Sequence, residues 1–127
     1  MNQQSTRYSA SDHPIVIHRH RARVIVRVGS QVVADTRKAL ALHEAALPVA
    51  LYIPREDVNM ALLEKSIHRT HCPYKGDAYY YSAFADGTWL DNVAWTYETP
   101  LPQVAQIKGH LSFYPDRIDE IIEEPFA

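Results

Sequence analysis

Residues 78–97 read AYYYSAFADGTWLDNVAWTY, in which two runs of aromatic and small residues flank the pair Asp86-Gly87. An Asp-Gly pair between such runs favours a two-residue type I′ turn, because both central positions of that turn need a positive φ. The stretch therefore predicts a β-hairpin in which Ala85 pairs with Thr88. This hairpin is the clearest local signal of structure in the chain.

The register of this hairpin also predicts which flanking segments meet. Continued along both strands, it sets Tyr80 against Val93 and extends to the residues beyond them. Lys75 is then expected either to pair with Glu98 or to bind an anionic group. The same register brings the segment around Cys72 against the end of the second strand, and we expect a pocket between the two.

Apolar runs bounded by turn residues predict further strands on both sides of the hairpin. They are expected at residues 15–17, 23–28, 32–35, 40–44, 49–53 and 107–114. Gly29-Ser30 marks a second hairpin. Its apolar faces match if a three-residue loop pairs Val28 with Val32. The same loop pairs Val26 with Ala34.

Two short helices are predicted as well. Asp57 is expected to cap the first, because the apolar side chains of residues 58–62 follow helical spacing. The second is expected over residues 116–124, packed on the basic first strand. Residues 39–47 are also rich in helix formers, so a helical turn is the alternative to the strand predicted there.

Length and composition place the chain among single globular domains. At 127 residues and 46% hydrophobic, it is long enough to bury a core without disulfides or a structural metal. We therefore predict a mainly β domain over residues 15–127. It is expected to be a single antiparallel sheet, strongly bent or partly closed, with one or two short helices. Residues 1–14 are predominantly polar and are expected to form a mobile tail.

Charge and cysteine content indicate the setting. One cysteine, and no apolar run of signal-peptide or membrane-span length, indicate a cytoplasmic protein without a membrane partner. Residues 1–38 carry seven Lys/Arg and two Asp/Glu, a net charge of +5, while residues 39–127 carry six and thirteen, a net charge of −7. The acidic part offers the basic part a partner within the same fold or in an identical subunit. Nucleic acid is therefore not the expected partner.

Ordered blocks spread over residues 22–120 carry a resemblance to a known family. They are residues 52–58, 70–76, 94–97, 107–110 and 113–117, which read YIPREDV, THCPYKG, AWTY, IKGH and FYPDR. These blocks resemble the DUF427 family, a group of small bacterial domains of unassigned function to which a nucleotidyltransferase-type label is attached. The sequence lacks the pattern of that chemistry, a Gly-Ser followed by spaced aspartates that hold two metal ions, because Gly29-Ser30 is followed by Gln31 and Val32.

Reactive side chains are concentrated among loop signals in residues 52–76, which indicates a site. Neighbouring cations would favour the thiolate of Cys72 and make it a nucleophile, and His110 or Glu98 would move protons. The alternative is a buried cysteine that acts as a small hydrophobe. The candidate catalytic residues are Cys72, Glu98 and His110, and the candidate ligand-binding residues are Arg55, His68, Lys75, Trp95 and Tyr97.

Each of these side chains also has a purely structural interpretation. Arg55 can grip a carboxylate or phosphate with two parallel bonds, or it can pair locally with Glu56. Trp95 and Tyr97 serve either as a platform for a ligand or as sheet core. A metal site is not predicted, because a second cysteine and His-Glu-x-x-His spacing are absent from the sequence.

The preferred functional hypothesis is a polar small-molecule pocket in an enzyme that acts on an anionic small molecule. The alternative is a non-catalytic β module that binds a ligand or a protein, in one version as a homodimer. The sequence identifies no cofactor, substrate or reaction.

Overall fold

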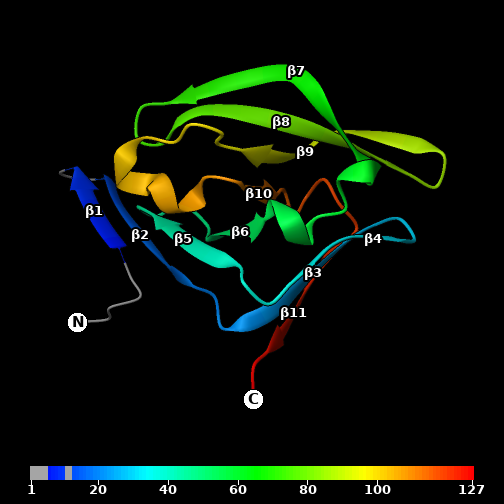
Figure 1. The fold of residues 1–127 in the computed structure, drawn as a ribbon, viewed down its shortest axis with the longest axis horizontal. Coiled ribbons are helices and arrows are strands. Elements are labelled where there is room, and N and C mark those ends of the chain that lie inside the picture. The colour runs from blue at the N-terminus through cyan, green and yellow to red at the C-terminus, as the bar shows by residue number, and fades with distance from the viewer. Residues whose placement is uncertain (1–5, 11–12) are drawn as a thin grey trace.

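The computed structural model describes residues 6–10 and 13–127 (Figure 1). Its strands are β1 Thr6–Ala10, β2 His13–Arg19, β3 Ala22–Val28, β4 Gln31–Thr36, β5 Leu40–Glu44, β6 Ala50–Pro54, β7 Leu63–Cys72, β8 Gly76–Ala85, β9 Thr88–Thr96, β10 His110–Phe113 and β11 Glu120–Pro125. The short 3-10 helices among them are η1 Arg55–Asp57, η2 Met60–Leu62 and η3 Pro102–Ile107. The predicted tail, residues 1–14, lies partly outside the described residues, and within it β1 pairs with β2.

The strands form two antiparallel sheets. The larger has the order β1-β2-β5-β6-β10-β9-β8-β7, and the smaller has the order β11-β3-β4. In Figure 1, β7, β8 and β9 lie at the top, while β3 and β11 lie at the bottom. The predicted class, mainly β and antiparallel, is confirmed. The strands are divided between two sheets, and helical structure in the described part of the chain is limited to 3-10 helices.

Two apolar clusters pack against the two faces of the larger sheet. The first joins Val24 and Val26 of β3 to Ile53 of β6 and therefore lies between the sheets. The second joins buried residues of the larger sheet, such as Tyr52, to Ile107 of η3. Alternation along a strand sends successive side chains to opposite faces, and β6, β8 and β9 contribute to both clusters.

The hairpin at Asp86-Gly87 forms with the predicted turn, and Ala85 pairs with Thr88. The predicted register fails further along the strands, where Tyr80 lies opposite Trp95 and not Val93. The reason is a bulge in which β8 uses one residue, Ser82, and β9 uses residues 91–93. Asn92 stands in this bulge with φ of 48°, a left-handed conformation that strand patterning does not reveal.

The hairpin at Gly29-Ser30 also differs from its prediction. Val28 pairs with Gln31, so the loop has two residues and the expected pairing of Val28 with Val32 is wrong. A bulge then restores the predicted pairing of Val26 with Ala34. The tight loop is held from the other hairpin, because Ser30 donates from its backbone N and its Oγ to the carboxylate of Asp86, at 2.9 and 2.6 Å.

The segment after β6 corrects the prediction of a short helix. η1 and η2 are single 3-10 turns, and Asp57 accepts a hydrogen bond from Thr36 at 2.7 Å instead of capping a helix. Asn59 takes the capping role, accepting from the backbone N of Ala61 at 3.3 Å. The chain then enters β7, an edge strand that the sequence did not predict. Most of its side chains are exposed, so its sequence has no alternating apolar pattern. The alternative helical turn at residues 39–47 is also wrong, since β5 is a strand.

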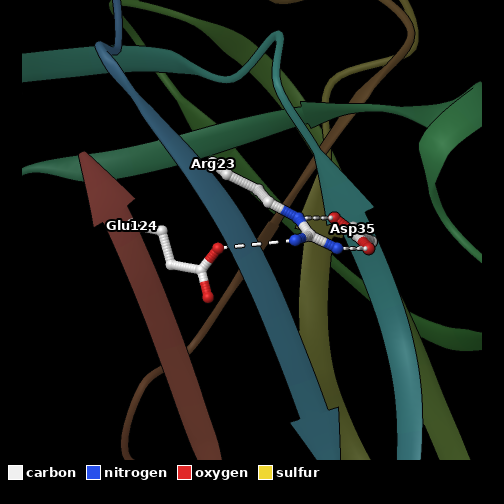
Figure 2. Close-up of polar contacts among 3 residues, drawn as sticks. All are labelled: Arg23, Asp35 and Glu124. Atoms are coloured by element: carbon white, nitrogen blue, oxygen red, sulfur yellow. Dashed lines mark hydrogen bonds and ion pairs between the residues drawn. The ribbon is translucent and has the colours of Figure 1, made fainter. Parts of the chain in front are cut away.

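The acidic C-terminal segment packs on the basic first strand as predicted, but as a strand and not as a helix. β11 pairs with β3 along its length. Figure 2 shows Arg23 of β3 between two carboxylates, with two bonds to Asp35 of β4 at 2.6 and 2.8 Å and one to Glu124 of β11 at 3.4 Å. Arg27 pairs with Glu120 at 3.2 Å. Part of the charge asymmetry is therefore neutralised within the smaller sheet.

Candidate functional site: an aromatic pocket with a buried ion pair

A cavity of about 270 Å³ opens on the face of the larger sheet that carries the second apolar cluster. Its floor holds one ion pair, Glu44 with Lys75, and its apolar wall includes Leu42, Leu47 and Ala50. The rest of the wall is aromatic. The rings are those of Tyr52, Tyr80, Trp95, Tyr97 and Tyr114.

The register of the sheet gathers these rings. Tyr80 lies opposite Trp95, Trp95 lies opposite Ser112, and Ser112 lies opposite Tyr52. Directly opposed residues point to the same face, so one row across β8, β9, β10 and β6 brings three rings to the pocket. The bulge at Asn92 is what places Trp95 in this row.

The rings also contact one another in fixed geometry. The indole Nε1 of Trp95 donates to the hydroxyl of Tyr52 at 3.1 Å, and the two rings meet edge to face. The ring of Tyr114 lies 4.4 Å from that of Trp95, centroid to centroid. Burial raises the pKa of Tyr114 to about 12, and it raises those of Tyr52 and Tyr97 further. The pocket wall thus presents neutral phenols over the whole physiological pH range.

Lys75 and Glu44 form the polar floor. Lys75 donates from Nζ to Glu44 Oε1, and the two residues are 7% and 8% exposed. The other carboxylate oxygen of Glu44 bonds Nε2 of His13 at 2.7 Å, and the imidazole of His13 stacks on Tyr74 at 3.8 Å. Burial alone would raise the pKa of Glu44, but the bonds from Lys75 and His13 outweigh burial and leave that pKa below its ordinary value.

The turn between β7 and β8 positions Lys75. Its backbone N donates to Cys72 at 3.3 Å, and its carbonyl accepts from the backbone N of Leu101 at 2.9 Å. Gly76 follows with φ of 111°, and a Cβ there would lie 3.3 Å from the carbonyl oxygen of Thr99. Glycine is needed at this point so that the turn can approach the segment after β9 closely.

Several predicted site residues meet at this pocket. Lys75, Trp95 and Tyr97 line it, and the ammonium of Lys75 lies 5.9 Å from the ring centroid of Tyr97. Cys72 packs, half-buried, among the same apolar side chains. His68 does not line the cavity, but its ring lies 4.5 Å from that of Tyr80, which does.

The other predicted site residues lie elsewhere. Arg55 donates to the hydroxyl of Tyr81 at 3.1 Å, and Tyr81 belongs to the cluster between the sheets. His110 uses Nδ1 to bond the carbonyl of Lys108 at 2.9 Å. The predicted pair of Lys75 with Glu98 is wrong because the bulge shifts the register, and Glu98 pairs with Lys65 at 2.7 Å on the surface.

Sequence reasoning did not assign four polar or aromatic residues of the pocket lining to a site, and these are Glu44, Tyr52, Tyr80 and Tyr114. It also assigned His13, which bonds Glu44, to the tail. Glu44 and Tyr52 reach the pocket through pairings of β2 with β5 and of β5 with β6, which join segments without a short turn signal between them. Alternation along residues 40–44 was a usable signal, since it places Leu42 and Glu44 on one face of their strand.

Metal-binding groups are not assembled at this pocket. Across residues 6–10 and 13–127, His, Cys, Asp and Glu side chains do not gather in groups of three that could hold a metal ion. Over the same residues, no helix is long and apolar enough to cross a membrane.

Fold and pocket together define a small, antiparallel β domain with an aromatic pocket over a buried ion pair. The chain matches the family described as a domain of unknown function, DUF427, over residues 16–124, and it belongs to that family. A search of curated proteins finds no match.

Proposed function

We propose that this protein is a small-molecule-binding β domain whose aromatic pocket takes a planar ring that bears a carboxylate or carbonyl oxygen. The observation that carries the proposal is the pairing of an aromatic wall with a buried Lys–Glu pair in one cavity. Ligand pockets are mostly apolar and aromatic, with few polar groups that fix orientation. A cavity of about 270 Å³ suits a single ring and not a nucleotide.

The aromatic wall supports the choice of a ring. Trp95 and Tyr114 lie 4.4 Å apart at a tilt of 43°, and Tyr80 lies parallel to Tyr114 at 6.5 Å. An added ring can meet such a wall in offset-stacked or edge-to-face geometry, which is worth about 0.5–1.5 kcal/mol per ring pair beyond area burial.

The ion pair supports the choice of an accepting oxygen. The ammonium of Lys75 has three protons, and one of them serves Glu44. Glu44 is held by the ammonium of Lys75 on one oxygen and by a hydrogen bond with His13 on the other, which offsets part of the repulsion between the carboxylate and an oxygen that approaches Lys75. A ligand carboxylate would gain the stronger, charge-assisted bond.

The proposed role of the pocket is binding, and it gives no catalytic role to Cys72, Glu98 or His110. Glu98 is engaged by Lys65, and His110 is engaged by a backbone carbonyl. Cys72 belongs to the packing around the pocket, which supports its role as a small hydrophobe.

Ligand-observed NMR with benzoate, benzamide and cyclohexanecarboxylate tests the proposal. Saturable binding in the order benzoate, benzamide, cyclohexanecarboxylate is expected. The chain supplies matched controls. Trp95→Leu and Lys75→Met should weaken benzoate binding about tenfold or more, while Trp89→Leu at the exposed hairpin tip and Lys65→Met in the surface pair should leave it unchanged. Absence of binding by all three compounds, or equal binding by the pocket and control variants, would refute it. Circular dichroism of each variant checks that it folds.

A further inference from the structure

A second and larger cavity, of about 580 Å³, lies on the opposite face of the larger sheet, and we propose that it binds the apolar tail of an amphipathic organic anion, such as a medium-chain carboxylate. Its wall is apolar and comes from both sheets. Val24 and Val26 of β3 and Ile53 of β6 are almost completely buried and form its base, while the partly exposed Val49, Leu51 and Ile121 stand around it. This site is separate from the aromatic pocket and does not depend on the function proposed for it.

Strand alternation separates the two cavities. Along β5, Ala41 and His43 line the larger cavity, while Leu42 and Glu44 line the aromatic pocket. The two cavities therefore use opposite faces of the same strands. At Ala50 they share a wall, since this residue lines both.

The rim of the larger cavity is polar and rich in imidazole. Nε2 of His18 and Nε2 of His43 lie 2.8 Å apart, and Nδ1 of His18 lies 3.1 Å from the carbonyl oxygen of Arg19. A carbonyl only accepts, so Nδ1 of His18 donates this bond. The contact between the two Nε2 atoms fixes both imidazoles at the rim of the cavity.

The rim continues into a shallower hollow of about 480 Å³ that adds cationic groups. His18, His20 and Glu123 line both spaces, and Arg19 and Arg21 line the hollow. Glu123 is the one carboxylate among the described residues that line either space, and His20 bonds it at 2.6 Å. The mouth of the apolar cavity therefore carries a surplus of cationic and potentially cationic groups.

This arrangement selects the class of ligand. An apolar tail gains by leaving water for the accessible side chains of Val49, Leu51 and Ile121, at roughly 0.8 kcal/mol for each buried CH₂. An anionic head at the end of that tail reaches the rim, where the guanidinium of Arg19 can donate charge-assisted bonds. A neutral head of the same size loses those bonds, so charge discriminates between otherwise matched compounds.

Isothermal titration calorimetry of the full chain with octanoate and 1-octanol tests the proposal. Octanoate is expected to bind at one site, at least about tenfold more tightly than 1-octanol. Val49→Trp, placed at a half-exposed position in the wall of this cavity, should abolish octanoate binding. Its control is Leu47→Trp, two residues away but in the wall of the aromatic pocket, which should leave octanoate binding intact.

The rim has its own controls. Arg19→Gln should weaken octanoate binding about tenfold, while Arg69→Gln, on the exposed edge strand β7, should not. The proposal is overturned if octanoate does not bind, if 1-octanol binds equally well, or if Leu47→Trp and not Val49→Trp abolishes binding. It is also overturned if sedimentation velocity shows a dimer that Val49→Trp dissociates, because the cavity would then hold a second copy of the chain.

Discussion

Lys75, in the turn between β7 and β8, donates a hydrogen bond to Glu44 at the end of β5, and both side chains are almost completely withdrawn from solvent. Residues 31 positions apart thus form a buried ion pair in the floor of the aromatic pocket. Breaking such a pair from one side leaves a charge without its partner in a poorly solvated place.

Lys75→Met keeps most of the aliphatic stem and removes the ammonium. We expect it to lower the free energy of unfolding by about 3–5 kcal/mol, measured by urea denaturation, because Glu44 loses its main partner. Lys65→Met is the control, since Lys65 pairs with Glu98 on the surface and its loss should cost less than about 1 kcal/mol. Equal losses in the two variants would show that the buried pair contributes no more than the exposed one.

Glu44 should also affect how the free energy of unfolding changes at acidic pH. Its pKa is lower in the folded state than its ordinary value of 4.5, so the folded state binds fewer protons. The stabilisation is therefore complete above pH 4.5 and is lost as the pH falls through the lower folded value. In urea titrations, the advantage of the wild type over Glu44→Gln should shrink below pH 4.5. An advantage that stays constant down to pH 3 would contradict the shift.

The pocket tyrosines should affect how the free energy of unfolding changes at alkaline pH. Burial raises the pKa of Tyr114 to about 12 and raises those of Tyr52 and Tyr97 further, so these phenols keep their protons when free tyrosine ionises near pH 10. Their stabilisation is complete below pH 10 and is lost as the pH rises through the folded values. Absorbance at 295 nm at pH 11 should increase on unfolding in guanidinium. Tyr114→Phe should reduce that increase by about one tyrosine.

Arg23 should stabilise the smaller sheet through the geometry of its guanidinium. Arg23→Lys cannot form the two parallel bonds to Asp35, so its melting temperature should fall at low salt. The difference in melting temperature between Arg23→Lys and the wild type should decrease in about 1 M salt, because exposed charges are screened. Arg27→Lys affects a single contact with Glu120, so its melting temperature should fall less. A larger fall for Arg27→Lys than for Arg23→Lys would contradict the role given to the paired bonds.

Asn92 should behave as a conformational position in β9. Its φ of 48° suits asparagine and glycine but strains a β-branched residue. In urea denaturation, the free energy of unfolding of Asn92→Gly should lie within about 1 kcal/mol of the wild-type value. That of Asn92→Val should be about 1–3 kcal/mol lower. The strain in Asn92→Val should also disturb Trp95, which a changed fluorescence spectrum in the Trp89→Phe background would report. An unchanged spectrum and unchanged stability would show that the bulge does not depend on residue 92.

Local signals in the sequence predicted the parts of the fold that depend on neighbours in the chain. Asp86-Gly87 and Gly29-Ser30 each form a turn, and the apolar runs became strands. The predicted register of the Asp86-Gly87 hairpin failed at a bulge, because a left-handed residue such as Asn92 changes the pairing without changing the alternating pattern. The prediction for the Gly29-Ser30 hairpin failed at its loop, which has two residues and not three. β7 was missed for a related reason, since an edge strand needs no apolar alternation.

The sequence predicted only part of the candidate site, again because it reveals local pairings and not distant ones. Lys75, Trp95 and Tyr97 follow from one hairpin and its flanks, so the sequence brought them together. Glu44 and Tyr52 reach them through strand pairings between segments that no short turn connects. A single sequence carries little information about such pairings, and the lysine was therefore assigned the wrong carboxylate.

Ala50 is the thinnest part of the partition between the two cavities, since a single methyl group is its whole side chain. Enlarging residue 50 would narrow both compartments at once, whereas residues 47 and 49 each control only one. β6 thus forms a wall that is common to both cavities.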